Sequence, residues 1–253
     1  MQLLLSQESQ AKCRWATHQG IYQFVYLLFG LRNAGAYFSR ATTRILAGLE
    51  GSCLAYLDDI IVFDEDFYPH LLSLQKASEL FDIKVSGKKL TSSAQSKITF
   101  LGHEISGNSY APAEHNILAI RDMPTTKTTK EVKSFLGMAD FFRRFIQGFA
   151  SIAAPLYELC KFRMVFQWGP TQQEAFTALK EALVSRPCLA FPQNQEFLLH
   201  TDGGEIAVGA ALSQRQDDSN ALAAVGYSSK ALLASQQKWS PTHIELFAII
   251  SAL

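Results

Sequence analysis

The sequence predicts an α+β protein, because strand patterns and helical patterns alternate along its 253 residues. Two apolar runs, Cys53–Leu57 and Ile60–Phe63, are separated by only two residues, which predicts a β-hairpin. Between residues 132 and 146, apolar side chains recur at helical spacing. Three strand-like stretches and then a helical one follow residue 196, so we expect a second, α/β unit there.

Composition excludes several classes of protein. The chain is 48% hydrophobic with 23 basic and 23 acidic residues, so it can form a sizeable core and is no globally basic nucleic-acid binder. Its four cysteines are far apart, which argues against a zinc site and disulfides and favours a reduced, intracellular protein. No apolar run could span a bilayer, and the first ten residues lack the basic start of a signal peptide.

Both ends of the sequence lack the signals that normally open or close a structural element. Met1 leads directly into an apolar run, and the last ten residues, IELFAIISAL, stop within a helical pattern without a C-cap. We therefore expect the chain to be a fragment of a longer polyprotein.

Mixed helices and strands are expected in the first 111 residues. A helix is predicted over 33–49, with Arg40 and Arg44 on a different face from the apolar side chains. The other expected elements are a strand over 20–30, a helix over 70–83 and a single strand over 96–106, whose pattern Gly102 weakens.

A small helical unit is expected over 114–163. Thr128 and Glu131 form a capping box at the start of its most regular helix. Five basic residues lie off the apolar stripe: Lys127, Lys130, Lys133, Arg143 and Arg144. They form either a solvated face or a face that follows nucleic-acid phosphates.

Two further helices carry clear start signals. One begins at Pro170, with Thr171 and Glu174 as a second capping box. The other has Ser240 as its cap and Pro241 at its first position.

Asp202 and Glu245 indicate a carboxylate site in the last part of the chain. Asp202 follows a strand-like stretch, and Glu245 lies in the first turn of the last helix. Taken alone, Asp202 could be a turn aspartate and Glu245 an ordinary first-turn acid.

Asp58 and Asp59 stand side by side where the hairpin pattern calls for a tight turn. Two-residue hairpin loops prefer Asn-Gly or Asp-Gly, and two adjacent carboxylates repel each other. An exposed polar turn is one explanation. The other is a pair of oxygen ligands for Mg²⁺ at the tip of a rigid hairpin.

Several segments, in order, resemble the reverse transcriptases of gypsy-like long-terminal-repeat retrotransposons. YLDD is similar to the Y-x-D-D motif, and QGIYQFVYLLFGLRNAGAYFSR to the palm segment before it. ITFLGHEIS resembles the primer grip, KEVKSFLGMADFFRRFIQGFASIAAPLYELCK the thumb, and FQWGPTQQEAFTALKEAL the connection. LLHTDGGEIAVGAALSQ and THIELFAIISAL resemble the first half of a tethered RNase H domain.

The resemblance divides the chain into four domains. It implies a palm over 1–111 without its N-terminal part and with incomplete fingers, and a helical thumb over 112–165. A connection over 166–195 and an RNase H-like α/β domain over 196–253, without its C-terminal part, would follow.

Roles for individual residues follow from the matched motifs. Catalytic and metal-binding roles are implied for the carboxylates Asp58, Asp59, Asp202 and Glu245. Nucleotide binding is implied for Phe29, Gly30 and Tyr56. Contacts with nucleic acid are expected for Phe100, Leu101, Gly102, Lys130, Lys133, Arg143 and Arg144. His103 and His200 are interpreted as structural, because Mg²⁺ prefers oxygen ligands.

The sequence also departs from the family pattern. Leu28 and Gly35 stand where the family usually has proline, and Gly35 is expected to loosen a turn near the nucleotide pocket. TDGG replaces the usual T-D-A-S. The family's third polymerase carboxylate would precede Met1, and two further RNase H carboxylates would follow Leu253.

The resemblance implies an RNA-directed DNA polymerase with tethered RNase H, hence nucleotidyltransferase and endonuclease activity. Two Mg²⁺ ions, or Mn²⁺ in their place, would serve each site. Expected partners are an RNA template, a DNA primer, their hybrid, deoxynucleoside triphosphates and the rest of the polyprotein, in a cytoplasmic particle or the nucleus, without a membrane.

Two hypotheses remain open at this point. In the first, the chain is an enzyme fragment that is inactive on its own, because each site lacks part of its carboxylate set. In the second, it is a non-catalytic retroelement remnant that at most binds nucleic acid or a protein partner.

Overall fold

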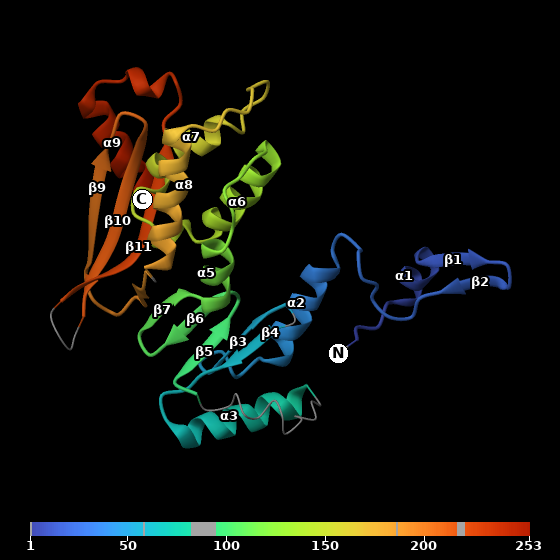
Figure 1. Cartoon of the computed structure of the whole chain (residues 1–253). Coiled ribbons are helices and arrows are strands. Elements are labelled where there is room, and N and C mark those ends of the chain that lie inside the picture. Colours follow the sequence, from blue (N-terminus) through green and yellow to red (C-terminus); the bar gives the residue numbers. More distant parts are fainter. Residues whose placement is uncertain (1, 58, 82–94, 186, 217–220) are drawn as a thin grey trace. The chain divides into compact units, whose positions relative to one another are not determined.

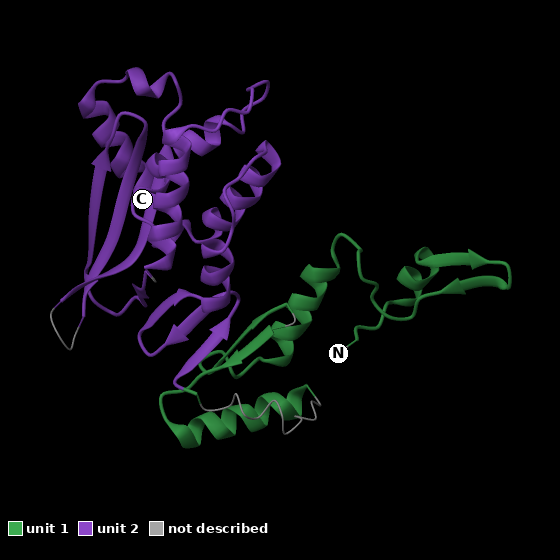
Figure 2. Ribbon diagram, in the orientation of Figure 1, with its two compact units in different colours: residues 1–95 green, residues 96–253 purple. Residues whose placement is uncertain are grey.

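The computed structural model describes residues 2–57, 59–81, 95–185, 187–216 and 221–253. The chain divides into two compact units, residues 1–95 (unit 1) and residues 96–253 (unit 2), as Figure 2 shows. Helices and strands are mixed in both, which confirms the predicted α+β class. The boundary expected at 111/112 falls inside unit 2.

Unit 1 consists of short hairpins and helices (Figure 1). Its described elements are α1 (Gln7–Lys12), β1 (Arg14–Thr17), β2 (Gly20–Gln23), α2 (Ala34–Ile45), β3 (Cys53–Tyr56), β4 (Asp59–Val62) and α3 (Phe67–Leu80). The helices predicted over 33–49 and 70–83 are therefore confirmed as α2 and α3. The strand expected over 20–30 is shorter, and β2 pairs with β1 in an antiparallel hairpin.

The core of unit 1 is small and lies around the β3–β4 hairpin. Its fully buried members are Leu46, Leu49, Cys53 and Ala77, and side chains of both hairpin strands pack against them. The hairpin contacts α2 through β3 and α3 through β4. These two helices therefore hold the hairpin that carries the YLDD sequence.

Unit 2 begins with a meander of three strands and continues as a helical layer and a second sheet. Its first described elements are β5 (Lys97–Phe100), β6 (His103–Ser106), β7 (Ser109–Pro112), α5 (Glu114–Arg121), α6 (Thr129–Phe141), the 3₁₀ helix η1 (Arg143–Phe145) and α7 (Phe149–Glu158). The later ones are α8 (Pro170–Val184), β8 (Leu189–Ala190), β9 (Phe197–Gly203), β10 (Ala207–Arg215), β11 (Leu222–Ala231), the 3₁₀ helix η2 (Gln236–Lys238) and α9 (Pro241–Ala252).

The prediction of a single strand over 96–106 is wrong. The chain reverses at Leu101 and Gly102, so this stretch forms the antiparallel hairpin β5–β6, and the sheet continues through β7 to β8. The reversal is possible because both turn residues adopt positive φ, at 49° and 77°. A leucine in that conformation is uncommon, so the apolar pattern hides the turn.

One hydrophobic core joins the predicted thumb and connection. Its buried side chains come from β7, the helices α5 to α8 and β8, from Tyr110 to Leu189. Ala224 and Tyr227 of β11 pack against it, so the predicted RNase H-like segment shares this core. The domain boundaries at 165/166 and 195/196 therefore divide a continuously packed unit and remain predictions.

The sheet β9–β10–β11 is antiparallel and has helices on both faces (Figure 1). Lys230 lies over the Phe247 ring of α9, whereas the neighbouring Ser229 bonds to Ala150 of α7. Successive strand residues point to opposite faces, so α9 covers one face and α7 the other. The predicted order of strand, turn, strand, strand and helix is confirmed.

Helix starts agree with the sequence in part. The Thr128 hydroxyl accepts from the Glu131 N–H as predicted, but the Glu131 carboxylate accepts from the N–H of Lys127, one residue before the cap. The second predicted capping box is wrong, because Gly169 is the cap of α8 and its N–H donates to the Gln172 side chain. A cap follows from local backbone geometry, and a pattern of residue types fixes it only to within a residue or two.

The last helix starts as predicted, with Ser240 as N-cap and Pro241 at the first position. Within the described ranges, no helix combines the length and apolar character needed to cross a bilayer.

Candidate active site

The YLDD sequence lies on the β3–β4 hairpin, and the register places Tyr56 opposite Asp59. Asp59 is therefore the first residue of β4 and is not part of the loop. This corrects the predicted turn, which placed both aspartates between the strands. Asp58 itself lies outside the described residues, so its predicted catalytic role stays a prediction.

Leu57 has a positive φ of 50°. Left-handed φ in a bulky residue is strained, of order 1–3 kcal/mol, and such strain concentrates at functional sites. Leu57 Cδ2 lies 3.6 Å from the position that a Cβ on Gly35 would occupy, so this loop packs against the first turn of α2.

Gly35 does not loosen a turn as predicted. It is the second residue of α2, in the first helical turn after the cap Asn33. The amide of that position has no acceptor inside a helix in any case, so proline and glycine are both compatible with it. The departure from the family pattern therefore leaves the local backbone helical.

A buried polar cluster lies where the chain leaves β4. Asp64 Oδ1 accepts from the Ser73 hydroxyl at 3.1 Å, and His70 Nδ1 lies 3.4 Å from Asp64 Oδ2. The side chain of Asp64 is only 9% exposed and that of His70 15%. The cluster ties the end of the YLDD hairpin to α3, and sequence analysis missed it because the three residue types are ordinary in a loop and a helix.

The predicted nucleotide-binding residues are open to solvent. Phe29, Gly30 and Tyr56 are all exposed, and Gly30 has a positive φ of 86°. None of the three lines the 790 Å³ pocket of unit 1. Their nucleotide-binding role stays a prediction.

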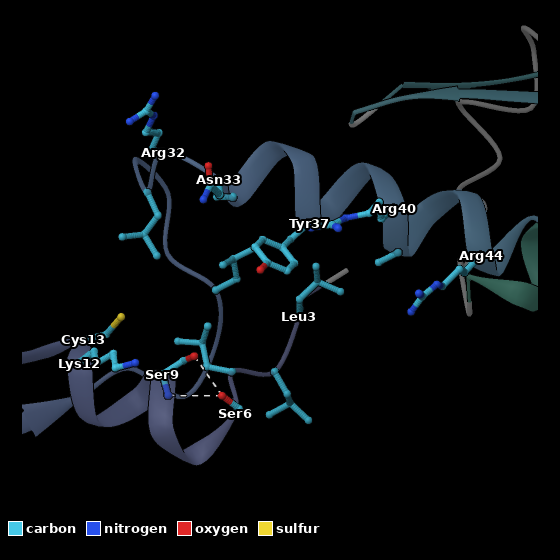
Figure 3. Close-up of a pocket in the computed structure, with 16 residues that line it drawn as sticks. Leu3, Ser6, Ser9, Lys12, Cys13, Arg32, Asn33, Tyr37, Arg40 and Arg44 are labelled. Carbon is cyan, nitrogen blue, oxygen red and sulfur yellow. Dashed lines mark hydrogen bonds between the residues drawn. The ribbon is translucent and has the colours of Figure 1, made fainter.

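That pocket lies between the N-terminal segment and α2, and Figure 3 shows Tyr37 pointing into it. Its walls combine five leucines with basic side chains, including Arg32, Arg40 and Arg44. Residues 37, 40, 41 and 44 follow helical spacing along one face of α2, so the prediction that Arg40 and Arg44 lie apart from the apolar side chains is wrong.

The primer-grip sequence forms the β5–β6 hairpin. Phe100 pairs with His103, and Leu101 and Gly102 form the two-residue turn between them. The Gly102 carbonyl accepts from Asn116 Nδ2 at 3.1 Å and from the Ala113 N–H at 3.0 Å. The turn is thereby anchored to the start of α5.

His103 is held by packing, as expected of a structural histidine. Its ring lies in a cluster with the rings of Tyr110, Phe141, Phe142 and Phe145. Burial lowers the pKa of His103, and the charge of Arg144 adds to this, against the raising effect of a hydrogen bond to the Leu101 carbonyl. His200 is exposed on β9, and its structural role stays a prediction.

Asp202 lies on β9 and Glu245 on α9, two elements that contact each other. A Cβ on Gly203, next to Asp202, would lie 3.1 Å from the Glu245 carboxyl carbon and 3.0 Å from Ile244 Cγ2. A side chain at 203 would require α9 to shift by a few tenths of an ångström, which gives the glycine at this place in TDGG a steric reason. Asp202 and Glu245 are both exposed.

The four predicted basic contacts separate into two kinds. Lys130 and Lys133 are exposed on α6. Arg143 donates to the Ser229 carbonyl and to Asp140, and Arg144 lies over the Tyr110 ring. All four are exposed, but the arginines also join η1 to β11 and β7.

Carboxylate oxygens are suitable ligands for Mg²⁺, which keeps several waters and takes one or two protein ligands. The exposed carboxylates of Asp59, Asp202 and Glu245 fit this requirement chemically. In the part of the chain that the structure describes, no group of three or more His, Cys, Asp or Glu side chains lies close enough to hold a metal ion.

Two family models match the chain, in an order that agrees with the fold. Residues 1–105 match the model for reverse transcriptase (RNA-dependent DNA polymerase). Residues 168–253 match the model for the RNase H-like domain found in reverse transcriptase.

Similar proteins include retrotransposon polyproteins. The retrovirus-related Pol polyprotein from transposon opus of Drosophila melanogaster is 33% identical over 272 residues, which cover 100% of this chain and 26% of that protein. The transposon Tf2-3 polyprotein of Schizosaccharomyces pombe is 30% identical over 240 residues, which cover 93% of this chain and 18% of that protein. The chain thus spans about a quarter or less of these relatives.

Solved structures show the same fold. The foamy viral protease–reverse transcriptase in complex with RNA/DNA hybrid has a TM-score of 0.83 and 20% identity, covering 98% of this chain and 34% of that one. Its complex with dsDNA gives a TM-score of 0.80. The two family models and the polyprotein relatives together place this chain in the reverse transcriptase and RNase H family of retrotransposon Pol polyproteins.

Proposed function

We propose that the protein to which this chain belongs copies RNA into DNA at the YLDD hairpin and cleaves the RNA strand of the hybrid near Asp202 and Glu245. The observation that carries the proposal is the YLDD hairpin, which is held between two helices, has a strained leucine in its loop and begins its second strand with Asp59. Such a hairpin can hold the Asp59 carboxylate at a fixed place, as metal-dependent chemistry requires.

At the polymerase site, Asp58 and Asp59 would hold the metal ions. When bound, Mg²⁺ would supply activation of the attacking oxygen and stabilisation of the negative charge that develops on the transferred phosphoryl group. The aspartates repel each other without metal, and this repulsion is relieved when the cations bind. Tyr56, opposite Asp59, would lie against the primer end, and Phe29 and Gly30 would border the nucleotide.

At the RNase H site, Asp202 would hold a metal ion from β9 and Glu245 from α9. Gly203 favours the close approach of α9 to β9, because a Cβ there would lie 3.1 Å from the Glu245 carboxyl carbon. The substrates would be the RNA template, the DNA primer, their hybrid and deoxynucleoside triphosphates, with Mn²⁺ as an alternative cation. A cytoplasmic particle or the nucleus would be the place of action.

The test is primer extension and hybrid cleavage by the polyprotein region that contains this chain. Asp58→Asn should abolish extension while cleavage continues, and Asp202→Asn should do the reverse, because each removes one ligand charge. Glu65→Gln, at an exposed acid after β4, is the matched control. Extension that survives Asp58→Asn would refute the polymerase assignment.

We also expect the 253-residue chain alone to be inactive in both assays, because it spans about a quarter or less of the polyproteins that it resembles. Misplacing a reacting group by 1 Å costs on the order of a hundredfold in rate, and a missing ligand costs more. Metal-dependent turnover by this chain, lost in Asp58→Asn or Asp202→Asn, would contradict that expectation. If the longer polyprotein region is also inactive in both assays, the result would favour the second hypothesis, that the chain is a non-catalytic retroelement remnant.

Nucleic-acid binding is proposed for the exposed face of α6. If Lys130 and Lys133 contact phosphates, binding to an RNA–DNA hybrid should depend less on salt when both are replaced with alanine. The negative slope of log binding constant against log salt concentration should become shallower by about two. Lys161→Ala is the control, because that lysine pairs with Glu158. An unchanged slope would make the two lysines part of a solvated face.

A further inference from the structure

The turn between β5 and β6 has an unusual backbone. Leu101 and Gly102 both adopt positive φ, as type I′ hairpin turns require. Glycine accepts this conformation freely, whereas leucine is strained in it. Strained residues persist only where surrounding contacts determine their conformation, so the contacts of this turn are informative.

Both carbonyls of the turn are held from outside it. The Leu101 carbonyl lies 2.9 Å from His103 Nδ1, and the Gly102 carbonyl accepts from Asn116 Nδ2 at 3.1 Å. The Ala113 N–H also donates to Gly102, at 3.0 Å. A carbonyl only accepts hydrogen bonds, so Nδ1 of His103 must carry the proton.

The His103 ring cannot easily turn away from this bond. Its centroid lies 5.5 Å from that of Phe141, 5.9 Å from that of Phe142 and 5.7 Å from that of Phe145. Tyr110, across the hairpin on β7, completes the cluster at 6.1 Å. The end of α6 and η1 therefore fix the direction in which Nδ1 donates.

Asn116 and Phe141 also pack directly on the turn. A Cβ on Gly102 would lie 3.2 Å from Asn116 Nδ2 and 3.5 Å from Phe141 Cε1. The Leu101 side chain, in contrast, remains 37% exposed at the tip of the hairpin. One side of the turn is thus bound to the helices while the other presents a leucine and the backbone to solvent.

We propose that His103 and Asn116 are positioning residues that hold the Leu101–Gly102 turn in the strained conformation in which it meets the end of the primer. The meeting with the primer rests on the proposed polymerase function. The resemblance assigns only Phe100, Leu101 and Gly102 to the primer grip. The hydrogen bonds show that His103 of β6 and Asn116 of α5 hold the turn in its conformation.

The first test is the tautomer of His103 in the full chain, read from the nitrogen chemical shifts of the ring by NMR. His103→Phe identifies the signal by its loss and keeps an aromatic ring in the cluster. The proposal expects the tautomer protonated at Nδ1. A ring protonated at Nε2 would overturn it, because Nδ1 would then offer no proton to Leu101.

The second test measures the turn itself. His103→Phe and Asn116→Asp each remove one donor with little change in volume, and Asn108→Asp in the exposed β6–β7 turn is the matched control. Amide exchange at Ala113, whose N–H donates to Gly102, should become at least tenfold faster in both variants and stay unchanged in the control. Unchanged exchange in both variants would overturn the proposal.

The third test addresses the primer. The probe is an RNA template annealed to a DNA primer that carries 2-aminopurine at its 3′ end. Both variants should bind it within threefold of the wild-type affinity, because Lys130 and Lys133 remain. The change in 2-aminopurine fluorescence on binding should be at least fivefold smaller in both variants than in the wild type. A full fluorescence change in both variants would overturn the primer role.

The outcomes separate the two proposals. A wild-type chain that shows the Nδ1 tautomer and slow Ala113 exchange but does not bind the hybrid would refute the proposed nucleic-acid function and leave the positioning of the turn supported. A chain that binds the hybrid but has the Nε2 tautomer would refute the positioning role alone.

Discussion

At the scale of single residues, the two hairpins that match family motifs both contain a leucine with positive φ. Leu57 belongs to the YLDD sequence, and Leu101 to the turn between β5 and β6. Among the described non-glycine residues, only Arg163 shares this conformation. Selection for stability alone would favour glycine or asparagine at both places. The strain therefore agrees with a functional origin for both turns.

Asp64 offers a residue-scale prediction. Asp64→Ala leaves the Ser73 hydroxyl, which is buried, without its acceptor. A buried polar group without a partner costs about 1–3 kcal/mol, so the free energy of unfolding should fall by that amount. Urea unfolding measures it, with the exposed neighbour Glu65→Ala as control. Equal effects of the two substitutions would show that the hydrogen bond contributes nothing.

At the scale of elements, the sequence predicted most helices and strands but not their contacts. Helices α2, α3, α8 and α9 follow from periodicity and start signals. The β5–β6 reversal does not, because a Leu-Gly pair in an apolar run carries no turn signal for the leucine. Likewise, residue types could not reveal that Arg143 bonds to the Ser229 carbonyl, 86 positions later in the chain.

The candidate sites were predictable to a similar extent. The resemblance predicted carboxylates at Asp202 and Glu245, and the structure places them on two elements in contact, with a steric reason for Gly203. The cluster of Asp64, His70 and Ser73 depends on how a loop folds back on a helix, which no local pattern encodes.

The first turn of α2 provides an element-scale prediction. Gly35→Ala should raise the free energy of unfolding by up to about 1 kcal/mol, because alanine favours the helix and its Cβ would meet Leu57 Cδ2 at 3.6 Å, an ordinary contact. Gly137→Ala in α6 is the matched control, since nothing lies within 4 Å of its Cβ position. Thermal unfolding measures both. Stabilisation by Gly137→Ala with destabilisation by Gly35→Ala would show crowding against the YLDD loop.

The contact between β11 and α7 gives a second element-scale prediction. The buried Ser229 hydroxyl accepts from the Ala150 N–H at 3.0 Å, so Ser229→Ala leaves that buried N–H unpaired. The expected loss of stability is about 1–3 kcal/mol in denaturant unfolding. Ser228→Ala, at an exposed serine on the other face of the strand, should change stability by less than about 0.5 kcal/mol. Equal losses would argue against the hydrogen bond.

At the scale of the whole molecule, His103 predicts a pH dependence of stability. Burial and the charge of Arg144 hold its pKa below the ordinary value of 6.5, although the bond to Leu101 opposes this. Below that value the unfolded chain binds the proton more readily than the folded one, so stability is lost as the pH falls through about 6.5. Urea midpoints between pH 5 and 8 should show this fall in the wild type and a smaller one in His103→Phe. Identical pH profiles would exclude His103 as the source.

The sharing of one core by residues 110–189 has a consequence for synthesis of the chain. Unit 1 closes its core with residues no later than Phe81 among those described, so it can fold while the rest is still being made. Unit 2 cannot, because Leu189 is fully buried in the core and β8 completes the sheet that begins with β5. Until the ribosome has released residue 190, the aromatic side chains of α6 and η1 lack part of their cover, and this interval is when a chaperone would be needed most.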